Sequence, residues 1–409
     1  DSSQANTSLV PRKRRTTVPD RPDLPINLWS IMKNCIGKEL SKIPMPVNFS
    51  EPLSMLQRVT EDLEYANILE EAASKTSLEQ MCYVAAYAAS NYSSACNRTN
   101  KPFNPLLGET YECDRMSDLG WRSITEQVSH HPPAAAHHAE GRGWVMYQDF
   151  TMSSRFRGKY LSIIPIGYTH VVFPGSKDHY SYKKVTTTVH NIIVGKLWID
   201  NHGDMEITNH QTGDKCTLKF FPYSYFSRDE PRKVYGIVRD KTNTPRYVVS
   251  GTWDKTMDMM KVTSWSGSPD KPKMELSEPY RIWTVNAPIK NADKMHNFTR
   301  LAIELNEEEE GVAPTDSRNR PDQRLMEIGN WDESNKKKQE IEEKQRQVRR
   351  KREAEMEKAI RRGDRYEEYQ PTWFVKEQDE LNGTLLHKFR GDYWKCKEQG
   401  DWDKCPSIY

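Results

Sequence analysis

The sequence predicts an α+β protein that is mainly β, in which a large antiparallel β-barrel is flanked by helical segments. From about residue 109 to 286 the chain reads as many short strand-like runs, separated by turns such as "NHGD", "QTGD" and "DKTN". Helical periodicity precedes this stretch and returns after it. Because no helices alternate with the strand runs, a parallel α/β sheet is disfavoured. About 180 residues of strand exceed the needs of a sandwich, so a barrel that encloses a cavity fits better.

Composition limits the classes of function. The chain has 409 residues, with 60 Lys and Arg against 58 Asp and Glu, so its formal net charge is only +2. Overall charge therefore indicates no polyanionic partner, and no nucleic-acid partner is expected. The seven cysteines are odd in number and form no CxxC pair, which favours a reducing cytosol over a disulfide framework. No apolar run reaches the length of about 18 residues that a spanning helix needs.

The first 43 residues are predicted to form an arm followed by a helix. Residues 1–26 are rich in Ser, Pro and Arg, carry "RKRR" at 12–15, and are expected to be flexible. Residues 27–43 have the period of an amphipathic helix, with Asn27 in the N-cap position. Periodicity alone leaves open an ordinary core helix or a lid over an apolar cavity. The apolar positions of this helix are Leu28, Met32, Ile36, Leu40 and Ile43, with Trp29 beside them.

Three further helices are predicted outside the strand region. The segment 52–74 is amphipathic, and 77–96 is apolar enough to indicate a buried helix. The segment 333–362 has strong helix formers and opposite charges at i,i+4 spacing but few apolar residues, which is typical of a solvated helix. Residues 364–409 are rich in Trp and Tyr and are expected to pack back on the body of the protein.

The segment "EQVSHHPPAAAHH" (126–138) holds four histidines and is the main candidate for chemistry. A metal site is disfavoured, because adjacent side chains of a strand point to opposite faces and neither histidine pair converges on one ion. Acid–base chemistry has no support from an accompanying motif, since the chain lacks GxSxG, HExxH, P-loop and GxGxxG patterns. The remaining interpretations are structural histidines or an anion site, in which imidazole N–H groups donate to phosphate.

An anion site needs basic partners from elsewhere in the chain. Lys101 and Asn104 lie in "NKPFNPLLGETYE", and Lys338, Glu342 and Arg346 follow one another at four-residue spacing on one helix face. That triple by itself is more typical of an ordinary salt-bridge ladder than of a binding site.

Together these segments resemble the oxysterol-binding protein family, and in particular its lipid-binding domain. The resemblance rests on "EQVSHHPP" (126–133), "KPFNPLLGETYE" (101–112), "HNIIVGKLWID" (190–200), "TGDKC" (212–216) and "PTDSRNRPDQR" (314–324), which occur in the family's order. It extends from about residue 27 to the C-terminus. It implies a near-closed antiparallel barrel with a central hydrophobic tunnel and an N-terminal lid helix. The resulting boundaries are 1–26 for the arm, 27–47 for the lid, 48–108 for a helical N-terminal subdomain, 109–300 for the barrel and 301–409 for a C-terminal helical subdomain.

The resemblance also implies roles for particular residues. His130, His131 and Arg346 would hold a monoester phosphate of phosphatidylinositol 4-phosphate, and Lys101 and Lys338 would meet its inositol ring and phosphates. Glu342 would accept ring hydroxyls, and Asn104 would add a neutral hydrogen bond. The lid stripe would close the tunnel. Asn91 and Tyr92 are candidates for a sterol hydroxyl by approximate position, and His137 and His138 return to a structural role.

The function implied is exchange of a sterol for phosphatidylinositol 4-phosphate between membranes, with no bond made or broken and no cofactor or metal. The alternative is a lipid sensor or scaffold that binds without transport, and a lipid-modifying enzyme is the third hypothesis. The expected location is cytosolic and peripheral to endoplasmic reticulum and Golgi-type membranes. The upstream membrane-targeting elements usual in the family are not recognised in these residues.

Overall fold

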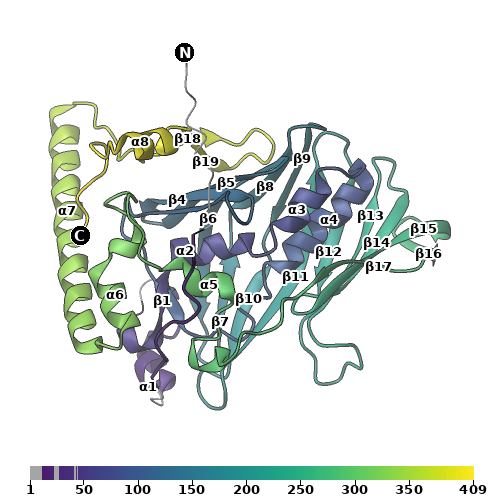
Figure 1. Ribbon diagram of the computed structural model, residues 1–409, viewed down its shortest axis with the longest axis horizontal. Helices are drawn as coiled ribbons and strands as arrows, with labels where there is room; N and C mark the ends of the chain where they lie inside the picture. The colour runs from purple at the N-terminus through teal and green to yellow at the C-terminus, as the bar shows by residue number, and fades with distance from the viewer. Residues whose placement is uncertain (1–11, 23–26, 41–42, 44) are drawn as a thin grey trace.

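A strongly curved antiparallel sheet dominates the computed structural model, which describes residues 12–22, 27–40, 43 and 45–409 (Figure 1). Fifteen strands make up this sheet. They are β3 Thr110–Arg115, β4 Trp121–His130, β5 Pro133–Gly141, β6 Trp144–Phe156, β7 Tyr160–Pro165, β8 Tyr168–Phe173, β9 Asp178–Lys183, β10 Thr186–His190, β11 Trp198–Asn209, β12 Lys215–Phe220, β13 Lys233–Arg239, β14 Pro245–Thr252, β15 Thr256–Ser268, β16 Lys271–Leu276 and β17 Tyr280–Thr284.

The strand order explains why the barrel is near-closed rather than closed. Neighbours follow one another from β3 to β7, then through β10 to β16, while β8 and β9 bridge β6 to β11 and β17 pairs with β15. Among the described strands, β3 at one end of this path does not pair with β16 or β17 at the other. The mainly β, antiparallel prediction is confirmed.

The helix α4 (Ser77–Ser90) fills part of the space inside the curved sheet. It contacts β9, β11 to β15 and β17, and every residue from Gln80 to Ser90 is buried. The helix predicted over 77–96 is therefore buried, as its largely apolar sequence indicates, although it ends at Ser90. The interior of this half of the barrel is occupied by a helix.

The prediction of one helix over 52–74 is wrong. The chain instead forms β1 (Ser50–Ser54), α2 (Met55–Thr60) and α3 (Asn67–Ala72), with a tight turn between the two helices. Ser54 starts α2 through a capping box with Gln57, so the residues before it are free to pair as a strand with β2 (Lys101–Phe103).

Buried charges fix the turn between α2 and α3. Arg98 binds Glu51 at 2.7 Å and Glu61 at 2.5 Å, and all three side chains are buried. A buried charge needs a partner, so these pairs hold Glu61 toward Arg98 instead of on the outer face of a continuous helix.

The predicted lid helix is much shorter than 27–43. The helix α1 spans Leu28–Met32, a tight turn continues to Cys35, and Gly37 adopts a φ of +87° that ends the helical path. The Asn27 side chain accepts from the Ser30 N–H at 3.1 Å, as expected for an N-cap. Ile36 departs from the expected apolar stripe, because it lies past the break and is 57% exposed.

The rest of the lid stripe does pack on the barrel. Leu28, Met32 and Ile43 are buried, with Trp29 and Leu40 partly buried beside them. Their partners are Phe156, Leu161 and Ile192, at the ends of β6, β7 and β10. The segment therefore covers one end of these strands.

The basic run of the N-terminal arm is docked rather than free where the structure describes it, in residues 12–22; the remainder of 1–26 lies outside the described residues. Arg12 and Arg14 lie within 4 Å of Glu307 and Glu309. Arg15 pairs with Glu327 at 2.7 Å, and Val18 is buried in the main core. An acidic surface next to the run supplied partners that sequence spacing could not reveal.

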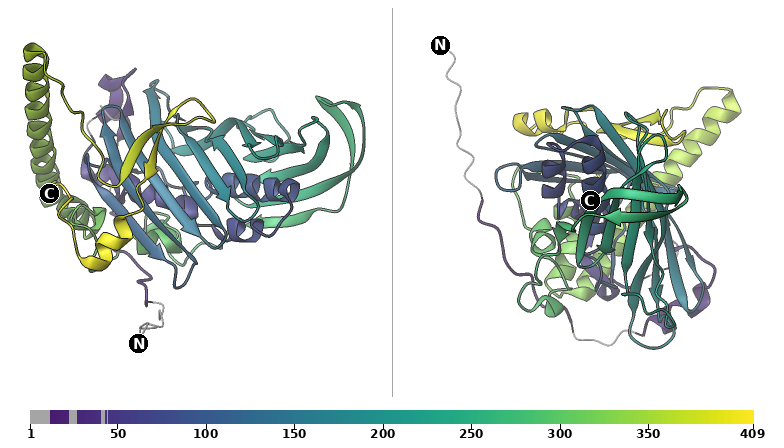
Figure 2. Two further views of the ribbon diagram at one scale, coloured as in Figure 1. Left: turned by 90° about the horizontal axis from the view of Figure 1, so that it is seen from above. Right: turned by 90° about the vertical axis from the view of Figure 1, so that its right-hand side faces the viewer.

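The C-terminal part forms a long helix and a packed tail. It contains α5 Arg300–Leu305, α6 Pro321–Glu327, α7 Trp331–Arg362, β18 Phe374–Gln378, β19 Leu385–Phe389 and α8 Tyr393–Gln399. Figures 1 and 2 show α7 along one side of the molecule, far from the β15–β16 hairpin. Only Ser334 and Ile341 of α7 are buried, as its charged sequence predicts. Trp373, Tyr393 and Trp394 pack on Ile124 and Val128 of β4, so the aromatic tail returns to the body.

Among the described helices, none has both the length and the apolar composition needed to cross a membrane.

Candidate functional site

The fingerprint "EQVSHHPP" forms the end of β4, a tight turn and the start of β5. His130 is the last residue of β4 and is half-buried, whereas His131 is exposed in the turn. Their rings stand nearly perpendicular, with centroids 4.6 Å apart. Two imidazoles are therefore presented side by side at one edge of the sheet.

The helix α7 brings an arginine to this turn. Arg349 Nη1 donates to His131 Nε2 at 2.6 Å, because a guanidinium has no acceptor. This contact leaves the His131 proton for Nδ1. Arg349 is not among the predicted site residues, although it lies in the basic run 349–352 of the predicted helix.

The surroundings of His130 favour its neutral form. Burial lowers the pKa of His130 to about 4, and the nearby His131 and Arg349 act in the same direction. Its Nδ1 atom is buried and has no hydrogen-bond partner among the described residues. Such a group suits an incoming anion, because a phosphate would supply both the missing partner and a compensating negative charge.

A second cationic group lies nearer the start of α7 and includes three of the predicted residues, Lys338 and Glu342 of α7 and Lys101 of β2. Lys338 and Glu342 lie 3.6 Å apart on successive turns. Burial lowers the pKa of Lys101 to about 8, and Lys338 contributes in the same direction while Glu342 opposes both. The charges of Lys338 and Glu342 therefore act on Lys101, and the role of the three as headgroup ligands stays a prediction.

This second group touches the lid segment. Lys338 Nζ donates to the Met45 carbonyl oxygen at 3.1 Å, directly after the part of the lid that packs on the barrel. The cationic group and the lid are therefore in direct contact.

Two predicted headgroup residues do not join these groups. The Arg346 side chain binds Glu343 at 2.9 Å and remains largely exposed. Asn104 is exposed, and its backbone oxygen accepts from Arg320 at 2.7 Å.

The other two histidines of the segment have different surroundings. His137 is buried on β5, where its Nδ1 accepts from Gln148 Nε2 at 3.0 Å, and burial lowers its pKa to about 3. His138 lies 3.7 Å from Glu140. Neither approaches the His130–Arg349 group through a contact in the described residues.

The candidates for a sterol hydroxyl lie just after α4. Tyr92 Oη accepts from the Val185 N–H at 2.9 Å, so its own proton remains free to donate. The Asn91 amide nitrogen faces two carbonyl oxygens, those of Tyr87 and Asp62, at 3.2 and 3.0 Å.

A buried polar cluster beside these residues was missed from the sequence. Gln148 donates to Asp62 at 3.0 Å, and Lys184 pairs with the same carboxylate. The Tyr182 hydroxyl is buried without a partner among the described residues. These residues come from β6, β9, the loop after β9 and the turn between α2 and α3, so no local spacing marks them.

In the part of the chain that the structure describes, no group of three or more His, Cys, Asp or Glu side chains is arranged to hold a metal ion.

Solved lipid-binding domains share this fold. The Osh1 ORD domain in complex with cholesterol has a TM-score of 0.85 at 34% identity, and the match covers 97% of this chain and 95% of that one. The Osh3 ORD from Saccharomyces cerevisiae in complex with PI(4)P has a TM-score of 0.80 at 29% identity, with 97% and 99% covered. Fold and site together place this chain in the class of domains built, like these two, on one strongly curved antiparallel sheet.

The chain belongs to the oxysterol-binding protein family, whose model, described as "Oxysterol-binding protein", matches residues 27–398. Mouse "Oxysterol-binding protein 2" is 54% identical over 405 residues, which are 97% of this chain and 44% of that protein. Saccharomyces cerevisiae "Oxysterol-binding protein homolog 1" is 38% identical over 409 residues, 94% of this chain and 33% of that one. The chain thus spans less than half of either relative. The resemblance inferred from the sequence is confirmed.

Proposed function

We propose that this chain exchanges a sterol for phosphatidylinositol 4-phosphate between membranes and holds either lipid in one lidded apolar tunnel. The observation that carries the proposal is the contact between Lys338 and Met45, because it links a cationic site to the lid segment. Structural neighbours in complex with cholesterol and with PI(4)P support the two ligands.

The charge of the site matches the proposed headgroup. A phosphomonoester carries about −1.5 to −2 charges near neutral pH, and a phosphodiester adds about one more. Lys101 and Lys338 supply two cations near the lid, and Arg349 supplies a third beside the two histidines. A headgroup with two phosphate groups could engage both parts of α7.

Exchange follows from competition for one cavity. Both lipids must remove their apolar parts from water, and burial of a few hundred Å² at about 25 cal/mol/Å² stabilises a bound sterol by several kcal/mol. The lid keeps that surface from water during transit. In this proposal the protein makes and breaks no bond, and it acts in the cytosol at endoplasmic reticulum and Golgi-type membranes.

Peripheral membrane contact has support in three exposed apolar side chains. Ile36, Val194 and Phe226 are 57%, 79% and 98% exposed, although they are large and apolar. They lie in the lid and in the loops after β10 and β12. Exposed apolar groups on a protein surface favour insertion into a bilayer surface.

A transfer assay tests the proposal. Liposomes loaded with sterol and acceptor liposomes loaded with phosphatidylinositol 4-phosphate should exchange lipids in both directions. His130→Ala with His131→Ala should abolish phosphoinositide extraction and leave sterol extraction largely intact. Equal loss of both activities would indicate a structural role for the histidines. Extraction without net transfer would favour a sensor or scaffold, and chemically altered lipid would favour an enzyme.

A further inference from the structure

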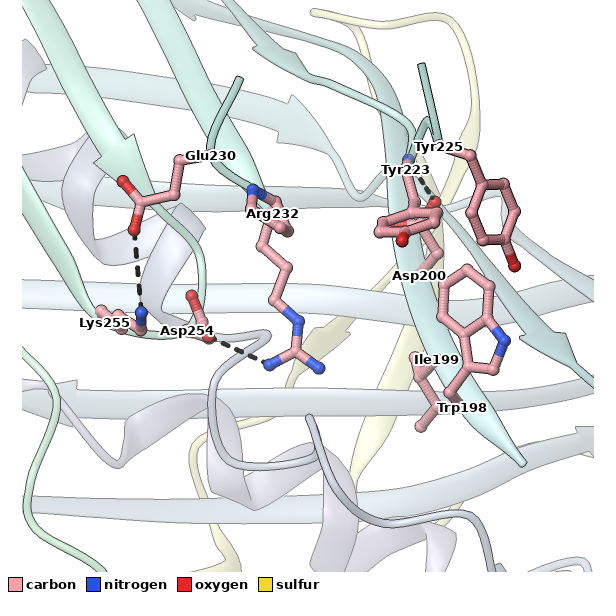
Figure 3. A pocket seen from close by; sticks show the side chains of 10 residues that line it. Trp198, Ile199, Asp200, Tyr223, Tyr225, Glu230, Arg232, Asp254 and Lys255 are labelled. Carbon is pink, nitrogen blue, oxygen red and sulfur yellow. Dashed lines mark hydrogen bonds and ion pairs between the residues drawn. The ribbon is translucent and has the colours of Figure 1, made fainter. Parts of the chain in front are cut away.

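A separate cavity of about 510 Å³ lies on the part of the sheet away from α7. It is a pocket open to solvent and bordered by the start of β11, the loop between β12 and β13, and the turn between β14 and β15 (Figure 3). None of its residues belongs to the histidine site. The side chains on its two sides have different chemistry.

One side of the cavity is an aromatic wall. The rings of Trp198 and Tyr223 are 5.3 Å apart at 68°, and those of Tyr223 and Tyr225 are 4.9 Å apart at 88°. Asp200 is buried and accepts from the Tyr223 N–H at 3.0 Å, which holds the loop against β11. His190 stacks on Trp198 at 4.2 Å and supports it. Nearly perpendicular aromatic faces with a carboxylate behind them attract a cation that lacks N–H groups.

The other side of the cavity is built from two ion pairs. Arg232 binds Asp254 at 3.0 Å and stacks on Trp253, and Lys255 lies 3.7 Å from Glu230. The Arg232 guanidinium has five N–H donors and commits one of them to Asp254, so it retains donors for an anion. Partly exposed pairs of this kind contribute about 0–1 kcal/mol, so an incoming anion can share them.

We propose that this cavity binds the phosphocholine headgroup of bilayer lipids. The aromatic wall would take the quaternary ammonium, and Arg232 with Lys255 would take the phosphate. A simple anion would leave the aromatic wall unused, and a simple cation would leave the donors of Arg232 and Lys255 unused. A headgroup with both charges satisfies both sides.

The position of the cavity favours a bilayer as the source of the headgroup. Tyr225 is 81% exposed, and the next residue, Phe226, is 98% exposed. The cavity therefore lies beside an apolar loop tip that fits the acyl region just below a layer of headgroups. This site does not depend on the proposed exchange of sterol and phosphoinositide.

Calorimetry and vesicle sedimentation test the assignment with matched ligands. Soluble phosphocholine should bind more tightly than phosphoethanolamine, which has the same phosphate but an ammonium with N–H groups. Vesicles of phosphatidylcholine should likewise retain more protein than vesicles in which phosphatidylethanolamine replaces it. Tyr225→Ala should weaken binding to both choline ligands roughly fivefold, the effect of one cation–π contact. Arg232→Gln should also weaken both.

Two control variants separate the cavity from other membrane contacts. Phe226→Ser lies in the same loop but does not line the cavity, so it should leave binding of soluble phosphocholine unchanged. His130→Ala with His131→Ala should leave both measurements unchanged, which distinguishes this site from the phosphoinositide site. Equal affinity for phosphocholine and phosphoethanolamine, or wild-type binding by a folded Tyr225→Ala variant, would overturn the proposal. Binding of soluble phosphocholine with no preference among vesicles would overturn the bilayer as its source.

Discussion

Arg349, rather than Arg346, is expected to be the more important arginine for the phosphate site. Successive helical residues are separated by about 100°, so Arg346 lies about 80° around the axis from Lys338, whereas Arg349 returns to about 20°. The structure agrees with this geometry, because Arg349 contacts His131 and Arg346 turns to Glu343. Residues at i+4 and i+8 lie progressively farther around the helix from residue i, whereas the residue at i+11 lies on nearly the same face as residue i.

The substitution Arg349→Gln should therefore reduce phosphoinositide extraction strongly. A hydrogen bond to a charged group contributes about 1.5–3 kcal/mol, which corresponds to a loss of affinity of about ten- to a hundredfold. The measurement is extraction of phosphatidylinositol 4-phosphate from liposomes across a titration of protein, with sterol extraction measured in parallel. Sterol extraction should stay near the wild-type level.

Arg350→Gln is the matched control. Arg350 is the adjacent residue with the same charge, but its side chain is 65% exposed and faces Glu343 at 3.8 Å. Its substitution should change phosphoinositide extraction by less than about twofold, as for a surface pair. If Arg350→Gln and Arg349→Gln reduced extraction equally, overall charge would explain the loss and the reasoning from helix geometry would be refuted.

Three further predictions concern stability and the lid. Burial lowers the pKa of His137 to about 3, so the folded protein holds this side chain neutral. Its contribution to the free energy of unfolding is therefore complete above pH 6.5 and is lost as the pH falls toward 3. His137→Gln should flatten that part of the curve of unfolding free energy against pH. The Glu126 carboxylate accepts hydrogen bonds from the N–H groups of Thr372 and Trp373, both at 2.8 Å. Glu126→Gln should therefore lower the free energy of unfolding in urea by about 1–3 kcal/mol and expose residues 364–409 to protease. Unchanged protection from protease would contradict this. In Gly37→Ala the added methyl group would have room, but the alanine must adopt a φ of +87°. The substitution should therefore destabilise this turn by about 1–2 kcal/mol and speed hydrogen exchange in residues 27–40. An unchanged exchange rate would show that the turn does not constrain the lid.

Local sequence pattern was sufficient to predict an element where the physical requirement for that element acts within one segment. The apolar side chains of 77–90 must leave water, which favours a buried helix. The short strand runs favour pairing with one another because each needs hydrogen-bond partners for its backbone. Opposite charges at four-residue spacing stabilise α7 without neighbours, so its existence was also predictable. The fingerprint around His130 identified the family because it retains many specific residues in order.

Contacts between segments that are distant in the sequence could not be predicted from local sequence pattern. The predicted helix over 52–74 is interrupted because Arg98 binds Glu61, and the basic arm is docked because acidic residues 307 and 309 lie next to it. In both cases the paired residues lie far apart in the sequence. Whether a charge is buried or neutralised therefore depends on which segments meet in the folded chain.

The sequence by itself determined that this chain forms a mainly antiparallel β fold of the oxysterol-binding protein family, with paired histidines and a charged late helix. Only the tertiary structure decided that Arg349 faces His131, that Lys338 touches the lid at Met45, and that Trp198 and Arg232 line one cavity. The reason is that periodicity reports which residues share a face of one element, whereas a binding site requires faces of several elements to converge.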